Sequence, residues 1–265
     1  MLPDVVAHRG ASAYRAEHTL AAYALAIEQG ADGLECDVRL SRDGHLVCVH
    51  DRTVNRTSNG RGVVSTMTLD NLAGLDFDGW HDTWDSADDL VRDERERREG
   101  PLTLADLIGL IADHPGIRLF VETKHPVRYG GLVEAKLVAL LARHGLAAPT
   151  TKADSRIVVM SFSFGAMRRL RADAPRLPTV LLLNRLWPHL NDGSLPRWAD
   201  ITGPGVHVLR TDPDYVQRSH ARGHDTYCWT VDAPDDVVLC RDLGVRYLAT
   251  NSPEDTRATL AGQDG

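Results

Sequence analysis

Ionisable side chains end four successive strand-like segments in the first half of this sequence. They are His8 and Arg9, Glu35 and Asp37, His50 and Asp51, and Glu122 and Lys124. One such group at a strand end is commonly structural, but four in a row favour a single shared site. Imidazole titrates near neutral pH, so His8 and His50 are the candidate proton carriers of that site.

The carboxylates Glu35 and Asp37 stand two positions apart in the otherwise apolar segment GLECDV. A strand places both on the same face, where buried negative charge is costly unless it is compensated. With Glu122 they form an all-oxygen ligand set, which suits a hard divalent cation such as Mg²⁺ or Ca²⁺. Ion pairs with Arg9 and Lys124 alone are the alternative. We favour the cation, because three carboxylates sharing one site need positive charge between them.

Two imidazoles beside a cation suit a displacement at phosphorus. One accepts a proton from the attacking hydroxyl and the other donates a proton to the leaving oxygen, while Arg9 and Lys124 neutralise the phosphoryl oxygens. The sequence has no G-x-S-x-G nucleophile motif and no glycine-rich phosphate loop, so a phosphodiester is favoured over an acyl ester or a nucleotide. The attacking group is either a neighbouring hydroxyl of the substrate, which gives a cyclic phosphate, or water.

The elements that must position these groups alternate between strands and helices along the 265 residues. Strands are expected at residues 5–8, 33–38, 46–50, 117–122, 156–162, 179–183, 205–209, 225–231 and 245–250. Amphipathic helices are expected between them, for example at 19–29, 131–145, 163–174 and 234–243, and Thr103 with Asp106 predicts a helix start. This alternation over a chain of this length predicts an α/β fold of the TIM-type (β/α)8 barrel.

The predicted barrel is irregular in two respects. Nine strand candidates are one more than a closed eight-stranded barrel uses, and the link from Asp37 to Leu46 is too short for a helical crossover. One strand is therefore antiparallel, outside the barrel, or part of an irregular second unit. Residues 51–100 contain many turn signals and one helix signal near 69–74, so we expect one domain over 1–265 with an insertion over 51–100 that caps the barrel mouth.

Charge and hydropathy exclude several classes of protein. The formal net charge of −7 provides no basic field for nucleic acid or anionic lipid. No apolar stretch approaches the roughly 20 residues of a membrane span, and the N-terminus shows no signal segment, so a cytoplasmic location is expected. The four cysteines lack C-x-x-C spacing and are predicted to be small buried apolar residues.

Several motifs taken together resemble the glycerophosphodiester phosphodiesterase family. They are AHRGAS (7–12), EHTLAAYALAIEQGADGLECDVRLSRDG (17–44), VHDRTVNRTSNGRG (49–62), VETK (121–124), MSF (160–162), CWTV (228–231) and LATNSP (248–253). The resemblance covers nearly the whole chain. It implies a TIM-barrel hydrolase that uses a divalent cation to cleave small glycerophosphodiesters into glycerol 3-phosphate and an alcohol.

The resemblance also assigns roles to individual residues. It implies His8 and His50 as the catalytic pair, Glu35, Asp37 and Glu122 as metal ligands, Arg9 and Lys124 as phosphate partners, and Trp229 as a wall of the glycerol or head-group pocket. Ordinary barrel core is an equally good interpretation of Trp229. Two departures from the family pattern lie near the site, since His18 stands where the family usually has Asn and Asn251 where Asp is common.

Other interpretations remain open at this stage. A phospholipase D-like enzyme acting on lysophospholipids needs an apolar entrance; Phe77, Trp80 and Trp84 could supply it, but they are interleaved with Asp76, Asp78, Asp82 and Asp85. A non-catalytic phosphodiester-binding barrel would not need paired histidines. A metal-dependent aldolase or isomerase would rely on Lys124 and ranks low. The sequence sets neither the leaving alcohol, nor the ion, nor the oligomeric state.

Overall fold

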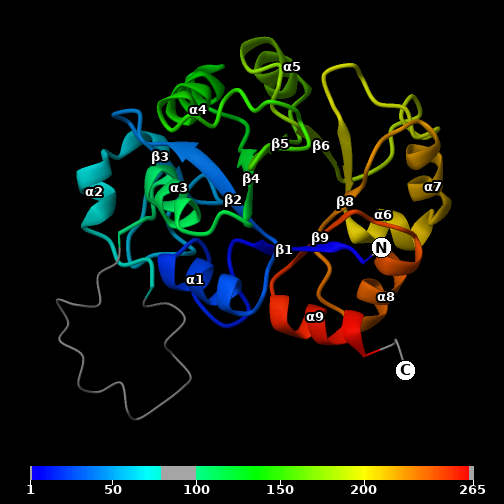
Figure 1. Cartoon of the computed structure of the whole chain (residues 1–265). Helices are drawn as coiled ribbons and strands as arrows, with labels where there is room; N and C mark the ends of the chain where they lie inside the picture. Colours follow the sequence, from blue (N-terminus) through cyan, green and yellow to red (C-terminus); the bar gives the residue numbers. More distant parts are fainter. Residues whose placement is uncertain (1, 79–99, 263–265) are drawn as a thin grey trace.

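Eight parallel strands form a barrel in the computed structural model, which describes residues 2–78 and 100–262. The strands are β1 (Asp4–His8), β2 (Gly33–Leu40), β4 (Arg118–Thr123), β5 (Ile157–Ser161), β6 (Thr179–Leu183), β7 (Ile201–Pro204), β8 (Tyr227–Cys228) and β9 (Tyr247–Thr250). They are ordered β7-β6-β5-β4-β2-β1-β9-β8. Parallel bridges from Thr202 to Thr226 and from Gly205 to Trp229 join β7 to β8 and close the ring (Figure 1). The prediction of a (β/α)8 barrel is confirmed.

The ninth strand lies outside this ring. β3 (Leu46–Cys48) pairs only with β2 among the described strands, and it runs antiparallel to it, with Val38 opposite Cys48 and Leu40 opposite Leu46. β2 extends beyond the barrel rim, and a turn at residues 41–45 brings the chain back toward the barrel mouth. The short link after Asp37 is therefore a hairpin, one of the outcomes that the sequence left open.

One strand assignment from the sequence was wrong. Residues 205–209, predicted as a strand, belong largely to helix α6 (Val206–Thr211), and β7 immediately precedes it. The sequence of β7, ITGP, contains glycine and proline, which weaken a strand signal, whereas the valines of GVHVL imitate one. The strand predicted at 225–231 is also shorter than expected, since β8 covers only two residues.

The helices surround the barrel (Figure 1), and α1, α2, α3, α4, α5 and α8 lie where the sequence predicted helices. They are α1 (Leu20–Glu28), α2 (Leu69–Ala73), α3 (Leu104–Ala112), α4 (Leu132–Arg143), α5 (Phe164–Asp173), α6, α7 (Asp214–Ala221), α8 (Pro234–Asp242) and α9 (Pro253–Ala261), with a 3-10 turn, η1, at Val64–Thr66. Thr103 and Asp106 cap α3 reciprocally, as their spacing predicted. Thr19 caps α1 by accepting a hydrogen bond from the Ala22 amide.

Strand side chains alternate between the barrel interior and the helix layer. On β2, Leu34, Cys36 and Val38 join the large core under the helices, so Glu35 and Asp37 point into the barrel. The interior is filled by a second apolar cluster from seven strands: Val6, Phe120, Val158, Met160, Val180, Leu182, Ile201, Tyr227, Tyr247 and Ala249. The pleat of β2 thus explains why two carboxylates occur within an apolar strand.

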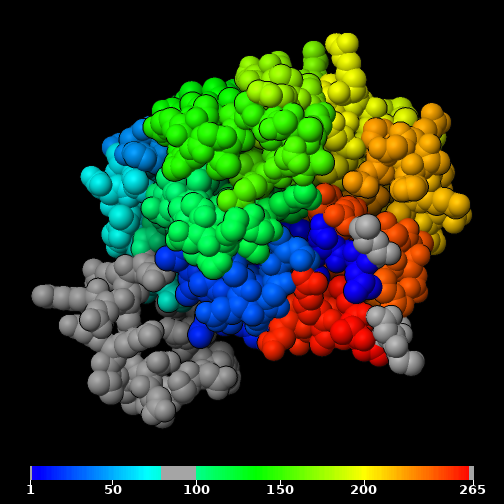
Figure 2. All heavy atoms as spheres, in the orientation of Figure 1, coloured from blue at the N-terminus to red at the C-terminus, as the bar shows by residue number. Residues whose placement is uncertain are grey.

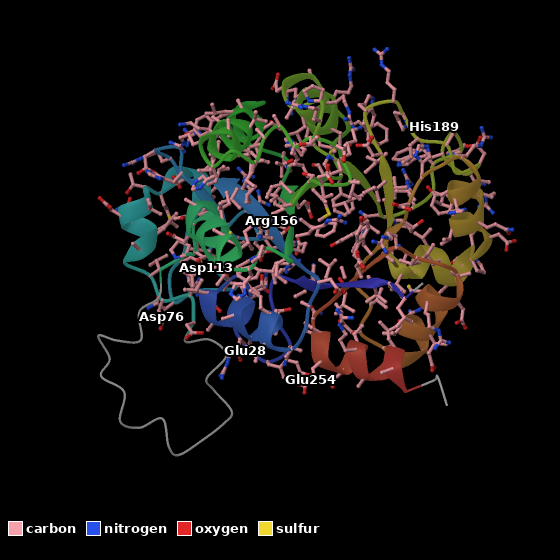
Figure 3. All side chains as sticks on the ribbon, in the orientation of Figure 1. Glu28, Asp76, Asp113, Arg156, His189 and Glu254 are labelled. Atoms are coloured by element: carbon pink, nitrogen blue, oxygen red, sulfur yellow. The ribbon has the colours of Figure 1, made fainter. Side chains whose placement is uncertain are left out.

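The two ends of the barrel differ in the kind of contacts that they hold. At the amino ends of the strands, Arg156 donates to the backbone carbonyls of Ile111 and His114 and thereby ties β5 to the end of α3 (Figure 3). Near the chain ends, α9 packs against the buried strand β1, and the blue N-terminal part of the chain adjoins the red C-terminal part in Figure 2. Contacts of this kind stabilise a barrel, whereas barrel active sites form at the opposite, carboxyl face.

The chain after β3 has a small core of its own. Phe77 is buried with Val47, Val54 and Leu72 in this cluster. Phe77 is therefore not available as part of the apolar entrance considered from the sequence; Trp80, Trp84, Asp82 and Asp85 lie outside the described residues. The single domain over 1–265 and the capping role of 51–100 stay predictions, since 79–99 also lie outside them.

The cysteines behave as predicted. Cys36, Cys48, Cys228 and Cys240 are all free and buried. No helix within the described residues has the length and apolar character needed to cross a membrane.

Candidate active site

A cavity of about 270 Å³ lies where the barrel strands reach their carboxyl ends. It is lined by His8, Arg9, Glu35, His50, Glu122, Lys124, Met160, Phe162, Leu182, Asn184, Tyr227 and Trp229. Phe162, Asn184 and Trp229 directly follow β5, β6 and β8, so loops from most of the barrel contribute to the wall. The structure thus brings together seven of the eight site residues predicted from the sequence, and Asp37 lies directly behind them.

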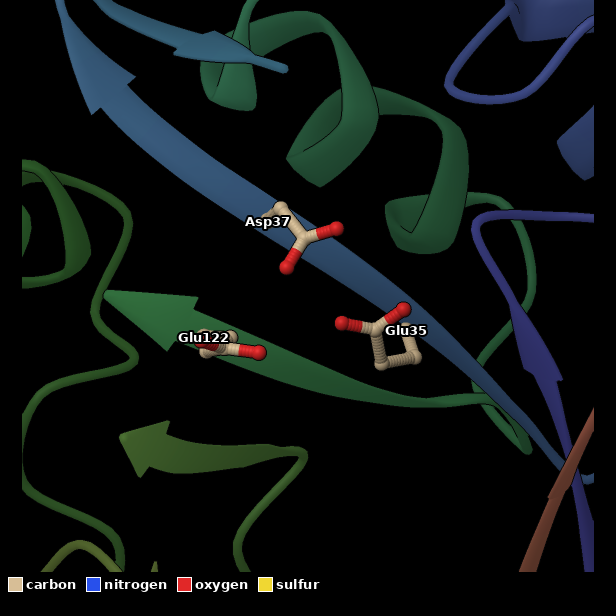
Figure 4. Close-up of side chains that lie close together, drawn as sticks. All are labelled: Glu35, Asp37 and Glu122. Atoms are coloured by element: carbon tan, nitrogen blue, oxygen red, sulfur yellow. The ribbon is translucent and has the colours of Figure 1, made fainter. Parts of the chain in front are cut away.

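The three carboxylates converge beside this cavity. Glu35 and Asp37 project from β2 and Glu122 from the adjacent β4, where Asp37 and Glu122 occupy paired positions (Figure 4). One oxygen from each side chain lies within 4.8 Å of the others, and all three residues are buried. This is the spacing and the donor chemistry that a hard divalent cation requires.

Two cations already contact part of this cluster. Lys124 Nζ lies 2.9 Å from Glu122 Oε1 and 3.2 Å from Asp37 Oδ1. Arg9 Nε lies 3.1 Å from Asp37 Oδ2, an ion-pair contact rather than a hydrogen bond. Glu35, which is 1% exposed, has no ion-pair partner among the described residues, and its side chain accepts from the Arg9 backbone N–H. Ion pairs alone therefore leave one buried carboxylate uncompensated, which fits a cation site.

The pKa values of the three carboxylates reflect how unevenly the neighbouring positive charges are shared among them. Burial, and then the charge of Asp37, raise the pKa of Glu35 well above its ordinary value and that of Glu122 to about 8. Burial acts in the same direction on Asp37, but Lys124 and the hydrogen bond from His18 outweigh it and hold the pKa of Asp37 well below its usual range. Without a cation, the cluster retains a proton on its glutamates near neutral pH.

His8 is held by an uncharged partner. Its Nδ1 lies 2.9 Å from Oδ1 of Asn251, which also accepts from Ser12 Oγ and whose amide nitrogen donates to Asp232. Because Asn251 Oδ1 can only accept, Nδ1 of His8 must carry the hydrogen, and Nε2 is left as the basic atom. Burial, and then the Arg9 charge, lower the pKa of His8 to about 3, so the ring is neutral.

His50 instead faces a carboxylate. Its Nδ1 lies 2.7 Å from Asp51 Oδ1, and Arg56 holds the other Asp51 oxygen at 2.8 Å. Arg56 also makes two hydrogen bonds to Glu17, at 2.7 and 2.8 Å. Burial raises the pKa of Asp51, but the hydrogen bonds from Arg56 and His50 outweigh it and lower that pKa to about 2. Burial lowers the pKa of His50; the charge of Asp37 and the hydrogen bond with Asp51 oppose this shift but do not reverse it.

Two residues at the site adopt the left-handed backbone conformation that favours glycine. Arg9 has φ 63° and His18 has φ 62°, and the His18 N–H donates to the Arg9 carbonyl. This turn lets the Arg9 N–H reach Glu35 and lets His18 Nε2 reach Asp37 Oδ2 at 3.1 Å, while His18 Nδ1 meets the Tyr23 hydroxyl. His18 thus contacts the acidic cluster from behind and does not line the cavity.

The aromatic wall of the cavity is built around Trp229. Its ring meets Phe162 edge-on at 5.3 Å between centroids, and its Nε1 donates to the Gly203 carbonyl at 2.8 Å. Lys124 Nζ lies 6.0 Å from the Phe162 ring centre. The hydrogen bond and the edge contact fix the indole as one apolar side of an otherwise charged site.

Comparison of the sequence with known proteins identifies the family of this chain. The model of the glycerophosphoryl diester phosphodiesterase family matches residues 8–255. The chain belongs to this family. A probable glycerophosphodiester phosphodiesterase 1 of Mycobacterium tuberculosis (strain ATCC 25618 / H37Rv) is 51% identical over 274 residues, covering 99% of this chain and 93% of the relative. A glycerophosphodiester phosphodiesterase of Bacillus subtilis (strain 168) is 32% identical, covering 94% and 83%. The resemblance read from the motifs is confirmed.

Solved structures agree on the fold. An Oleispira antarctica phosphodiesterase, in complex with the product sn-glycerol-3-phosphate, superposes with a TM-score of 0.80 at 23% identity and covers 98% of this chain and 97% of its own. A glycerophosphodiester phosphodiesterase from Agrobacterium tumefaciens has a TM-score of 0.73 at 26% identity, covering 97% and 100%. The phosphodiesterase family comprises phosphoric diester hydrolases, so the predicted enzyme class is confirmed as well.

The sequence reasoning missed some residues of this phosphodiesterase site. Arg39 is the next inward position on β2 after Asp37, and the alternation that revealed the carboxylates could have revealed it too. Arg56 and Asn184 gave no such signal, because their places depend on chain folding between distant segments. Glu17, on the loop before α1, accepts hydrogen bonds from Arg56 and Arg9.

Proposed function

We propose that this protein hydrolyses glycerophosphodiesters to glycerol 3-phosphate and an alcohol, by His8/His50 acid–base catalysis and with a divalent cation. The observation that carries the proposal is the pair of histidines with unlike partners on one small cavity, beside three buried carboxylates. The family supports it, and so does the activity named for the Mycobacterium tuberculosis relative.

Glu35, Asp37 and Glu122 would hold the cation, either Mg²⁺ or Ca²⁺. When bound, it would supply Lewis-acid polarisation of the phosphoryl group and offset the charge of the three carboxylates. Arg9 and Lys124 both line the cavity, where their charges would neutralise the phosphoryl oxygens as charge accumulates on them.

The unlike partners of the two histidines support different roles for them. His8 is neutral with its hydrogen on Nδ1, so its Nε2 accepts the proton of the attacking group, which is either water or the neighbouring glycerol hydroxyl. In the second case, water then opens the cyclic phosphate to give glycerol 3-phosphate. His50 has an ionised carboxylate behind it, which stabilises the imidazolium, so it donates a proton to the leaving alkoxide as the P–O ester bond breaks. Trp229 and Phe162 would pack against the glycerol or the head group.

The test is release of glycerol 3-phosphate from glycerophosphocholine by purified protein, with Mg²⁺ or Ca²⁺, with EDTA, and with His50→Ala. We expect turnover that both EDTA and the substitution abolish. Turnover that ignores EDTA would overturn the metal role of the carboxylates. No turnover by folded protein would overturn the diesterase assignment, and choline release from lysophosphatidylcholine would then support the phospholipase D-like alternative.

A cytoplasmic location stays a prediction.

A further inference from the structure

A second, larger pocket of about 400 Å³ lies at the rim of the barrel, outside the catalytic cavity. It is lined by Arg39, Leu40, Arg52, Val63, Val64, Ser65, Thr66, Pro126, Val127, Arg128, Tyr129 and Val133. Three arginines and no carboxylate appear in this lining. We call it the arginine pocket.

The arginine pocket opens at the same end of the barrel as the catalytic cavity. Arg39 shares the inward face of β2 with Glu35 and Asp37, and it stands about 7 Å beyond Asp37 along the strand. Its Nε and Nη2 donate to the His50 carbonyl at 3.0 and 2.9 Å. Pro126, which also lines the pocket, follows the cavity residue Lys124 by two positions. The same segments of β2 and of the chain after β4 therefore border both spaces.

Two chain segments meet across the pocket and fix its walls. Val54 N donates to the Gly62 carbonyl and Val64 N to the Arg52 carbonyl, which holds Arg52 beside the wall residue Val64. From the other side, the Tyr129 hydroxyl lies 3.5 Å from the Ser65 carbonyl. The walls therefore come from the segment after β3 and the loop between β4 and α4.

The guanidinium groups of the arginine pocket are not neutralised by carboxylates of the described residues. Among the described residues, Arg39, Arg52 and Arg128 have no ion pair with a carboxylate, although Arg128 lies over the Tyr129 ring at 5.4 Å. Asp51, Asp37 and Glu122 face Arg39 from the catalytic side, but Arg56 and Lys124 already contact them.

The chemistry of such a site is that of an anion receptor. Guanidinium groups bind phosphate through two parallel hydrogen bonds. The first turn of α4 contributes Val133 to the wall, and the carboxylate in that turn, Glu134, is already paired with Arg169. Leu40, Val127 and Tyr129 give the pocket an apolar side against which a ring could pack.

We propose that the arginine pocket is a leaving-group subsite, and that it selects glycerophosphodiesters whose alcohol carries a second phosphate. The inference rests on the proposed function, because the pocket adjoins the site from which the alcohol would leave. The substrate would lie with its scissile phosphate beside the acidic cluster and its second phosphate between Arg52 and Arg128.

The experiment compares glycerophosphoinositol with glycerophosphoinositol 4-phosphate, two substrates that differ only in the second phosphate. With the full chain and Mg²⁺, we expect kcat/KM to be about tenfold or more higher for the phosphorylated substrate, since exposed charge-assisted contacts of this kind discriminate on that order. Added NaCl should reduce the preference, because salt screens exposed charges.

The variant Arg52→Ala/Arg128→Ala should remove the preference and leave turnover of glycerophosphoinositol within about twofold of wild type, since neither side chain lines the catalytic cavity. Arg61→Ala removes an exposed arginine of the same segment outside the pocket lining and serves as the matched control, expected to keep the preference. Equal kcat/KM for the two substrates, or a preference that the double variant keeps, would overturn the inference. Glycerol 3-phosphate release in those same assays would leave the proposed diesterase function standing, whereas its complete absence would overturn both.

Discussion

Asn251 accepts a hydrogen bond from Nδ1 of His8, so a neutral amide stands where a carboxylate would stabilise the imidazolium. The pKa of His8 is lowered to about 3, first by burial and then by Arg9. A catalytic base with so low a pKa stays unprotonated throughout the neutral range, and its titration does not limit activity there.

Asn251→Asp should therefore shift the acid limb of the pH–rate profile. A carboxylate beside Nδ1 raises the pKa of His8 by roughly one to three units, so kcat/KM should begin to fall at a correspondingly higher pH than in wild type. The measurement is kcat/KM for glycerophosphocholine across pH 4–9. Asn191→Asp, the same change at an exposed position, is the control. An unchanged acid limb in Asn251→Asp would argue against His8 as the base.

Cation affinity should depend on pH through Glu122. Burial and Asp37 raise the pKa of Glu122 to about 8, so a cation that binds the carboxylate must displace a proton below that pH. For one displaced proton the affinity for Mg²⁺ or Ca²⁺ should fall about tenfold per pH unit from 8 downward. Calorimetric titration at pH 6, 7 and 8 measures this, and a pH-independent affinity would contradict it.

The raised pKa of Glu122 also predicts how the stability of the cation-free protein changes with pH. Because the pKa of Glu122 is higher in the folded than in the unfolded chain, its contribution is full below about pH 4.5 and is lost as pH rises toward 8. Thermal unfolding in EDTA should therefore show Tm declining over this interval, and added cation should raise Tm most at pH 8. Glu122→Gln should flatten the decline. A Tm that rises steadily with pH in EDTA would disprove this linkage.

Asp51 and Arg56 should act by positioning His50. His50→Ala removes a proton carrier and should lower kcat by roughly 10²–10⁴-fold. Asp51→Asn and Arg56→Ala leave the imidazole in place, so kcat should fall by roughly 10–100-fold with KM little changed, by analogy with the loss of other partners that orient a functional histidine. His45→Ala, at a half-exposed histidine on the same hairpin, should keep full activity. If Arg56→Ala instead lowered kcat and raised KM by equal factors, Arg56 would contact the substrate rather than only position His50.

Phe77 should matter for the site although it lies in a separate apolar cluster. Phe77→Ala leaves a void beside Val47 and Leu72 and should cost roughly 3–5 kcal/mol of unfolding free energy, if this cluster unfolds with the barrel. Cation affinity should survive, because β2 and β4 carry the ligands. Activity should decline, since His50 follows β3. Denaturant unfolding measures the stability, calorimetry the cation affinity, and glycerol 3-phosphate release the activity. If Phe77→Ala lost cation binding together with activity, the cluster around Phe77 would not be independent of the metal ligands.

The sequence predicted the acidic cluster well for a definite physical reason. Glu35 and Asp37 are two apart on a strand, and the pleat alone places them on one face. The position of Glu122 follows from the parallel neighbour β4. Their depth was misjudged, however, because β2 continues to Leu40 and the carboxylates lie within the strand rather than at its end.

Other features could not be derived from local patterns. His50 was predicted at the end of a barrel strand, but it reaches the mouth through the antiparallel return of β3. The contacts of Glu17 with Arg56 join segments 39 residues apart, and no periodicity encodes such a pairing. β7 escaped notice because its pairing with β6, rather than its composition, makes ITGP a strand.

The position of β3 outside the ring has an evolutionary consequence. The eight parallel strands close without it, so residues 49–78 take no part in the strand pairing of the ring, whereas β2 and β4 carry both that pairing and the acidic cluster. The chain thus separates the ring strands, which hold His8 and the acidic cluster, from a segment outside the ring that contributes His50 and Arg52. Over evolution, side chains around His50 in this segment can vary while the pairing of β2 with β4 keeps the acidic cluster in place.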